Sequence, residues 1–290
     1  MVVPRCPVRS VRFPVRVRPS HEQDDHRSGG YRTRRAEPHR RPADAGGQEI
    51  PGDPGRGADL PRALPADSRV LTIAGIREFR YVSVYFDTPG QDSYLASARG
   101  RRRRWKIRER DYLDSGMRWL EVKTCRGERT VKQRLQIDVA ERGRWSAGDR
   151  HEMHRALSVC GMPSVPLDAL APRLNTSYLR TTLVEPGSGT RVTLDRRLIW
   201  TSADDVRAVR LGELTVVETK SAGMAPGRVD HLLWSIGVRP HRFSKFATGL
   251  AILEPGLPHN RWHSTIGHLR SRLREGRPET AAATMRSESS

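Results

Sequence analysis

The chain has few of the residues that would build a disulfide framework, a metal cluster or a membrane span. It has three cysteines in 290 residues, Cys6, Cys125 and Cys160, and they show neither metal-ligand spacing nor a pairing pattern. Such usage is typical of a reducing compartment. No apolar run approaches the ~20 residues that a bilayer requires, and the first residues lack the apolar segment of a signal peptide. We therefore expect a cytoplasmic protein.

Acidic residues are also scarce relative to basic ones. Asp and Glu number 33 against 52 Lys and Arg, which gives a formal net charge of +19. A strong positive balance favours phosphate-rich partners or anionic surfaces and says nothing about the fold. On charge alone, a nucleic-acid binder remains open. The length allows one large domain or two smaller ones.

Residues 1–62 contain no lysine and little periodic hydrophobicity, with many Arg, Pro, Gly and Asp. This composition predicts a disordered basic arm. A second explanation is a frameshift. When codons for Glu37 to Arg62 are shifted by one base, choices exist that encode SPIVDLQTRVDRKYLVTLAEARTS, which reads as a basic strand followed by a helix start. On this hypothesis the printed chain lacks its first strand.

The stretch from Trp105 to Leu135 reads as three short antiparallel strands with period-two alternation, separated by turns at 113–116 and 126–128. Apolar residues such as Ile107 and Val122 take one face. The cations that share the other face are Arg104, Lys106, Arg108 and Arg110, then Lys123, then Lys132 and Arg134. The bland interpretation is a solvated sheet face, but such faces usually mix signs. This one favours a polyanion.

Further elements follow in order along the chain. We predict strands at 68–73, 79–87, 175–183, 191–200 and 214–220, and helices at 92–98, 146–160, 226–236 and 246–253, with a basic helix-like stretch at 261–274. Glu218 and Lys220 repeat the Glu-x-Lys spacing of Glu121 and Lys123. For Glu121 we expect a simple ion pair with Lys123. Tyr85, Phe86 and Trp105 are expected in the core.

Several short motifs occur together and in a fixed order. They are Tyr85 to Pro89, Lys106-x-Arg108-x-Arg110, Leu120 to Lys123, Val131-Lys132-x-Arg134, Ser177-Tyr178-x-Arg180, Arg191 to Asp195, Glu218-x-Lys220 and Phe243 to Lys245. This ordered set resembles the VTC domain, the polyphosphate-polymerase branch of the triphosphate tunnel metalloenzymes. An ordered set is far more specific than any single motif. The shifted-frame TRVDRKYLV is also similar to the first strand of that family.

The resemblance implies an α+β protein with a closed antiparallel barrel of eight strands and flanking helices, in which the first strand is missing or disrupted. It implies a tunnel domain at 63–257, after the segment 1–62 and before a basic tail at 258–290. Carried over by motif position, catalytic contacts would come from Arg108, Lys123, Arg180 and Arg191. Phosphate-binding residues would be Lys106, Arg110, Lys132, Arg134, Tyr178, Lys220, Arg242, Ser244 and Lys245. Glu218 would bind a divalent Mn or Mg ion.

The resemblance further implies transfer of a terminal phosphoryl group from ATP or another nucleoside triphosphate to inorganic polyphosphate. Two other function classes remain open. One is a metal-dependent hydrolase of triphosphate or polyphosphate, which is disfavoured because the shifted-frame strand offers only one acid. The other is a non-catalytic polyanion binder. No specific nucleic acid is expected, and any membrane association would need a membrane-protein partner.

Overall fold

The computed structural model describes residues 64–127, 129–138, 142–212, 214–221, 226–270 and 272–276, and additionally the backbone of strands β1 and β2. The strands are β1 (Arg9–Arg12), β2 (Glu49–Gly52), β3 (Arg69–Thr72), β4 (Glu78–Asp87), β5 (Arg103–Tyr112), β6 (Met117–Arg126), β7 (Arg129–Ile137), β8 (Ala171–Glu185), β9 (Thr190–Ser202), β10 (Ala208–Arg210), β11 (Thr215–Lys220) and β12 (Arg274–Gly276). The helices are α2 (Asp92–Ala98), α3 (Ala147–Val159), η1 (Leu167–Ala169), α4 (Arg228–Ser235), α5 (Lys245–Leu253), η2 (Asn260–Trp262) and α6 (His263–Arg270).

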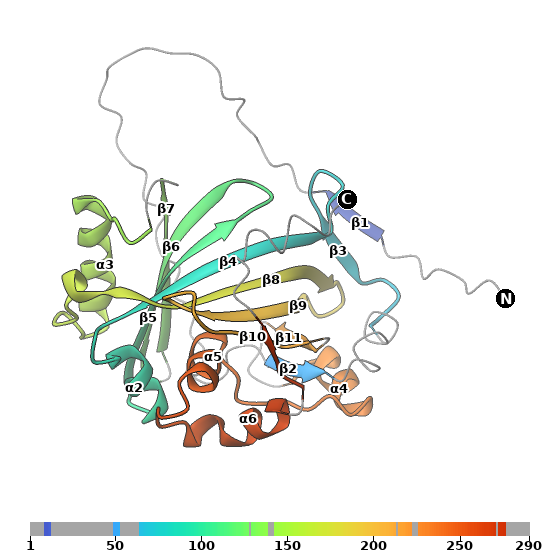
Figure 1. Cartoon of the computed structure of the whole chain (residues 1–290). Helices are drawn as coiled ribbons and strands as arrows, with labels where there is room; N and C mark the ends of the chain where they lie inside the picture. Colours follow the sequence, from blue (N-terminus) through green and yellow to red (C-terminus); the bar gives the residue numbers. More distant parts are fainter. Residues whose placement is uncertain are drawn as a thin grey trace, which may run out of the picture.

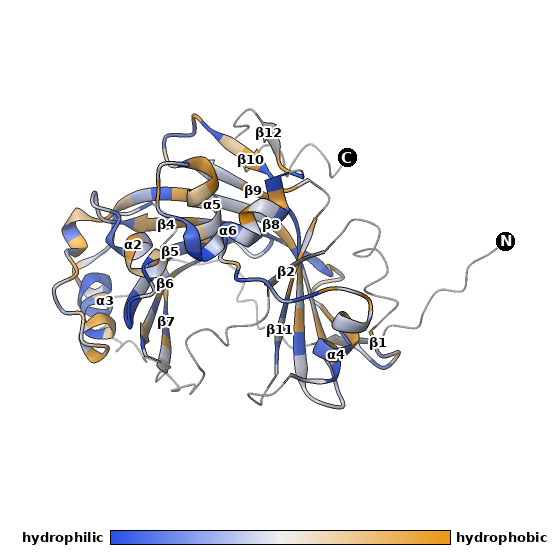
Figure 2. Cartoon of the chain, turned by 90° about the horizontal axis from the view of Figure 1, so that it is seen from below, coloured by the Kyte–Doolittle hydropathy of each residue, from blue (hydrophilic) through white to orange (hydrophobic). Residues whose placement is uncertain are grey.

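A single curved sheet dominates the fold (Figure 1). Its strands run in the order β12-β10-β9-β8-β4-β5-β6-β7. Strand β11 also pairs with β9, along the edge opposite β8, where it lies beside the first part of β9 and β10 lies beside the last part. The pairs from β7 through β4 and β8 to β11 are all antiparallel. Figure 2 shows the resulting arch, with β7 and β11 at its two ends. The predicted α+β class and the three-stranded meander are thus confirmed.

The predicted closure of the barrel is not confirmed. Within the described part of the chain, β7 pairs only with β6, and no strand pairing joins β7 to β11. A sheet closes only when its two outer strands meet. Here the place beside β11 is taken by the four residues of β2, a segment that falls in the region of the suspected frameshift. The described strands therefore form an open arch and not a closed barrel.

The N-terminal region is described only at β1 and β2. The rest of the segment 1–62, expected to be disordered or out of frame, lies outside the described residues, as does most of the tail after 276. The predicted helix at 261–274 is shorter than expected, because α6 ends at Arg270 and β12 then pairs with β10.

Strand register fixes which residues share the inner face of the arch. Directly paired residues lie on the same face of an antiparallel sheet. Arg134 pairs with Glu121, Glu121 with Arg108, and Arg108 with Tyr85. On the other half of the arch the inner-face pairs are Tyr81 with Tyr178, Arg180 with Asp195, Thr193 with Glu218, and Arg191 with Lys220. One continuous face therefore runs from β7 to β11.

The outer face of the sheet is covered by helices α3 and α4. Ile107, Leu120 and Val122 pack with residues of α3, and Val192, Leu194 and Val217 pack with residues of α4. Helix α3 begins with a capping box, in which the Ser146 side chain accepts from Asp149 N and the Asp149 carboxylate accepts from Ser146 N. Because apolar alternation buries this outer face, the opposite face is left for polar side chains.

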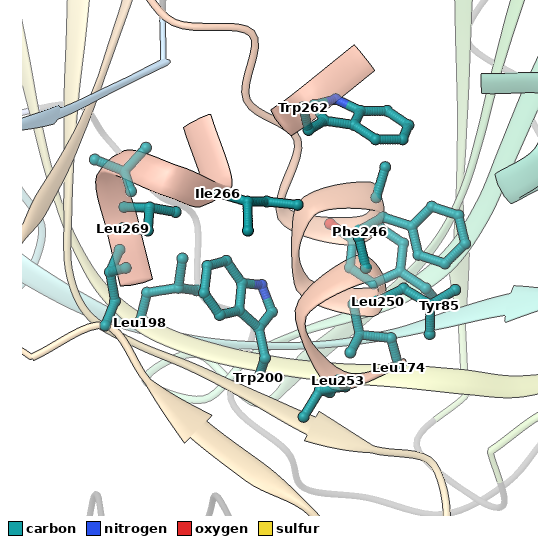
Figure 3. Packing of buried hydrophobic residues seen from close by; sticks show 14 of the residues in the cluster. Tyr85, Leu174, Leu198, Trp200, Phe246, Leu250, Leu253, Trp262, Ile266 and Leu269 are labelled. Carbon is teal, nitrogen blue, oxygen red and sulfur yellow. The ribbon is translucent and has the colours of Figure 1, made fainter. Parts of the chain in front are cut away.

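Helices α5 and α6 fill one part of the inner face (Figure 3). Phe246 and Leu250 of α5 pack with Tyr85, Leu174 and Trp200 of the sheet. Gly249 makes this approach possible, because a Cβ built there would lie 2.2 Å from Trp200 Cδ1. The Trp200 indole also donates to the Lys245 carbonyl at 2.8 Å. This packing places the start of α5, with Ser244 and Lys245, at the edge of the remaining polar inner face.

Candidate functional site

The first half of the site is built around Glu121 on β6. Its side chain is 2% exposed, and Oε2 lies 2.5 Å from Arg108 Nη2. Oε1 lies 2.8 Å from Lys132 Nζ and 3.1 Å from Arg134 Nε. A buried carboxylate is costly unless it is paired, and here three strands supply its partners. The predicted pairing of Glu121 with Lys123 is wrong, because the alternation placed both on one strand face but the cross-strand cations lie closer.

The pKa values of Glu121 and Lys132 are shifted because several charged side chains lie close together in this cluster. Burial alone would raise the pKa of Glu121, but Arg108, Arg110 and Lys132 outweigh it and hold that pKa well below its usual range. For Lys132, whose side chain is 44% exposed, desolvation by the surrounding protein and the neighbouring cations Arg108 and Arg110 lower the pKa to about 7, although the Glu121 carboxylate opposes this shift. Lys132 therefore gains a full charge most readily when an additional anion arrives.

Beside Glu121 lies a row of three lysines without an acid among them. Lys106, Lys123 and Lys132 are directly paired across β5, β6 and β7. Like charges in register are unfavourable in an empty sheet. Lys106 Nζ donates to Ser244 Oγ at 2.8 Å, which ties β5 to the start of α5. Lys123 is exposed. Lys132 is paired with Glu121, so the repulsion within the row is only partly offset.

The second half of the site is built around Asp195 on β9, which is fully buried. Its carboxylate receives Arg180 Nε at 2.5 Å and Nη2 at 2.7 Å, and Lys245 Nζ lies 2.7 Å from Oδ2. Burial would raise the pKa of Asp195, but Lys245 and Arg180 lower it below its usual range. Asp195 was not among the predicted site residues, although it is the last residue of the Arg191 to Asp195 motif.

Tyr178 lies between the two halves. Arg110 Cζ, Arg180 Cζ and Lys245 Nζ lie 5.8, 5.2 and 5.2 Å from the centroid of its ring, so three cations surround one aromatic face or edge. Arg110 also donates to Ser83 Oγ at 3.0 Å. The Tyr178 hydroxyl is buried and has no hydrogen-bond partner among the described residues. A buried hydroxyl without a partner among the described residues, close to three cations, is free to donate to a ligand.

Glu218 lies on β11 next to these cations. Its Oε1 is 2.6 Å from Lys220 Nζ, so the acid forms an ion pair with the lysine two positions later on the same strand face. Burial would raise the pKa of Glu218, but Lys220, Arg180 and Lys245 lower it to about 2. The neighbouring Thr193 Oγ1 is also buried and lacks a partner within the described part of the chain. Glu218 is therefore ionised and lies on a face with hydroxyls that await an acceptor.

We tested whether these residues suit a divalent metal. The described residues contain no group of three or more His, Cys, Asp or Glu side chains that could hold one. A single carboxylate among cations does not bind a bare ion, but Mg²⁺ is commonly held by one or two carboxylates together with phosphate oxygens. Glu218 therefore fits a metal that arrives with a phosphate chain.

The structure brings together most of the predicted site residues, but not all of them. Arg191 lies on the inner face opposite Lys220 and is exposed. Arg242 is exposed in the segment before α5, where its carbonyl accepts from Thr265 Oγ1, and no described contact ties it to either half of the site. Tyr85 is buried as predicted, and its hydroxyl also accepts from Arg108 Nη1 at 2.9 Å.

The comparison with protein families identifies the class of the chain. The family model described as the VTC domain matches residues 58–254, which is most of the sequence. The chain belongs to the VTC domain family, and the resemblance drawn from its motifs is confirmed. No curated protein matches the chain.

Solved structures show more distant likenesses. A candidate adenylate cyclase from Bacillus halodurans has 14% identity and a TM-score of 0.45, with 68% of this chain and 91% of that chain covered. A candidate adenylyl cyclase from Hippeastrum, described as having a dominant triphosphatase activity, has 18% identity and a TM-score of 0.41, with 73% and 98% covered. The PH1819 protein from Pyrococcus horikoshii has 13% identity and a TM-score of 0.40, with 71% and 96% covered.

The helices of the described segments are all too short or too polar to cross a membrane.

Proposed function

We propose that this protein is a polyphosphate polymerase that transfers the terminal phosphoryl group of a nucleoside triphosphate, such as ATP, to the end of an inorganic polyphosphate chain. The proposal is supported by membership of the VTC domain family and by one observation above all. Cations from separate strands and from α5 share one face around the partnerless hydroxyl of Tyr178. A phosphate chain supplies the acceptor atoms that this face lacks.

The transfer needs no protein nucleophile. A terminal oxygen of the polyphosphate forms a bond to the γ-phosphorus, the bond from that phosphorus to the β–γ bridging oxygen breaks, and a nucleoside diphosphate leaves. Both reactants are anions, so the protein must neutralise and align them. Arginines hold phosphate oxygens in pairs, whereas lysines act as compact charges.

The two halves of the site suit these tasks in different ways. Arg180 and Lys245 are held by Asp195 and are nearly buried, so they form a rigid contact surface for the reacting phosphates. Lys123, Lys132 and Arg134 are more exposed and suit a sliding chain. A Mn²⁺ or Mg²⁺ ion at Glu218, completed by phosphate oxygens, would offset the charge that develops on the leaving oxygens. Arg108 stays with Glu121 and Tyr85, which fixes its position.

A hydrolase would use the same residues with water as the acceptor in place of the polyphosphate end. The experiment must therefore separate transfer from hydrolysis. The frame-corrected protein is incubated with ATP and Mn²⁺, and the products are resolved on a polyphosphate gel, with Glu218→Ala as the site variant. The matched control is Glu78→Ala, which removes a surface carboxylate paired with Arg196.

Ladders of polyphosphate that require Glu218 and persist in the control support the polymerase. Free phosphate without ladders identifies a hydrolase. Tight polyanion binding without turnover, unaffected by divalent ions, identifies a binding protein.

A further inference from the structure

A group of exposed arginines lies outside the site, where β5 begins. Arg99, Arg101 and Arg102 lie between α2 and β5, and all three are exposed. Arg126 at the end of β6 is exposed as well, and its neighbour Gly127 donates from its N–H to the Arg102 carbonyl at 2.9 Å. A third segment contributes Arg261, whose Nη1 would lie 3.0 Å from a Cβ built on Gly100. We call Arg99, Arg101, Arg102, Arg126 and Arg261 the arginine strip.

The exposed arginines of the strip have no evident role in stabilising the fold. The adjacent arginines do have structural partners: Arg103 lies against Gly161 at the end of α3, and Arg104 donates to the Arg101 carbonyl and to Cys125 Sγ. By contrast, Arg101, Arg102 and Arg126 form no ion pair with any acid of the described segments. Among the described residues, concentrated like charge with no paired acid raises the energy of the free surface and favours a bound polyanion.

Part of the strip adjoins the site along one strand, because Arg101 and Arg102 lead into β5, whereas Arg126 pairs with Arg103 on the outer face of the sheet. Arg104 and Lys106 share the inner face of β5, and Lys106 is the first cation of the lysine row. A strand rises ~3.3 Å per residue, so the start of β5 lies about 10 Å from Lys106. A short ligand held at Tyr178 ends before this point. A long phosphate chain that passes Lys106 meets the strip next.

We propose that the arginine strip is a docking surface for the distal part of a long polyphosphate chain whose end lies in the site. This inference rests on the proposed function, because it assigns a second contact to the same polymer. It predicts that these arginines add affinity for long chains that a short ligand does not gain. Contacts of this type release counterions, so they also steepen the salt dependence of binding.

The test compares two ligands and two triple variants of the full chain. The strip variant is Arg101→Gln, Arg102→Gln and Arg126→Gln. The control variant is Arg77→Gln, Arg196→Gln and Arg239→Gln, which makes the same charge change at exposed positions elsewhere. Affinities for tripolyphosphate and for long-chain polyphosphate are measured by calorimetry at several salt concentrations, after a thermal melt has shown that each variant is folded.

We expect the strip variant to lose about tenfold or more in affinity for long-chain polyphosphate at ~0.1 M salt, with a shallower salt slope. Its affinity for tripolyphosphate should stay within about twofold of the wild type, and the control variant should resemble the wild type for both ligands. An equal loss in both variants, or an equal loss for tripolyphosphate and long-chain polyphosphate in the strip variant, would overturn the proposal. Failure of the wild type to bind tripolyphosphate would instead reject the proposed function.

Discussion

The Glu121 carboxylate on β6 lies 2.5 Å from Arg108 Nη2 on β5, and this ion pair organises one half of the inner face. It holds Arg108 between two strands, while Lys132 and Arg134 reach the same carboxylate from β7 with much of their side chains exposed. Lys132 and Arg134 can therefore turn to a ligand without unburying Arg108. The following predictions test this arrangement and its counterpart at Asp195.

Replacing Glu121 with Gln should lower the free energy of unfolding by about 2 kcal/mol, because Arg108 keeps its buried position and loses its counter-charge. Urea denaturation measures the change. Glu78→Gln is the matched control, since its pair with Arg196 is on the surface and should contribute less than about 0.5 kcal/mol. A Glu121 variant as stable as the wild type would show that the pair does not hold the two strands together.

Lys132 should make phosphate binding depend on pH. Burial and nearby cations lower its pKa to about 7 in the free protein, and a bound anion favours the protonated form. Binding of tripolyphosphate should therefore take up a proton and weaken as the pH rises from 6 to 8.5. The Lys132→Arg variant remains charged throughout and should lose most of this slope. Identical slopes for the two proteins would exclude Lys132 as the titrating group.

Asp195 should contribute to stability against acid. Lys245 and Arg180 outweigh burial and lower its folded pKa below the unfolded value of about 3.9. Its contribution is therefore fully present above that pH and is lost as the pH falls below it. Asp195→Asn should destabilise the protein by about 3 kcal/mol at pH 7, because two cations lose their partner, and should flatten the stability curve below about pH 4. If the variant and the wild type lose stability equally below about pH 4, Asp195 is not the group responsible.

Tyr178 offers a substitution that separates function from stability. Its hydroxyl lacks a partner among the described residues, so Tyr178→Phe should leave the unfolding free energy within about 0.5 kcal/mol and weaken tripolyphosphate binding about three- to tenfold. Tyr94→Phe is the control, because that hydroxyl donates to the Pro258 carbonyl at 3.2 Å, away from the site. The control should reduce stability alone. A Tyr178→Phe variant that is less stable but binds tripolyphosphate as the wild type does would show that the ligand does not contact this hydroxyl.

The suspected frameshift gives a further prediction. Register pairs position 49 of β2 with Glu218, and the printed residue there is Glu49, whereas the shifted frame places lysine at this position. A lysine opposite Glu218 would be complementary, and a second acid would not. We predict that the frame-corrected chain is active and that the printed chain is inactive or folds poorly. Equal activity of both chains, or an intact frame in the sequenced locus, would reject the frameshift.

Much of this site could be predicted from alternation, since it showed which side chains of β5, β6 and β7 share a face. It did not show which residues pair across strands, and so it assigned Glu121 to the wrong lysine. The turn at 113–116 carries that information, because counting outward from it brings Arg108 opposite Glu121. The same count from the turn after Glu185 brings Arg180 opposite Asp195, a residue that the predicted site did not include.

Other features could not be predicted from the sequence because they depend on contacts between distant segments. The approach of Arg261 to Gly100 and the seating of α5 on Trp200 depend on how helices pack, and no local pattern specifies that. The prediction of a closed barrel failed for a different reason. It requires a strand to join β7 and β11, and within the described residues only the short β2 lies beside β11.

The central claim is that cations from the two halves of the arch bind one phosphate chain. Calorimetry of tripolyphosphate with the wild type, Arg108→Ala, Arg180→Ala and the double variant tests it most directly. The account predicts one ligand per chain, a large loss in each single variant, and a loss in the double variant that differs from the sum of the two. Two independent binding sites, or strictly additive losses, would contradict a shared site.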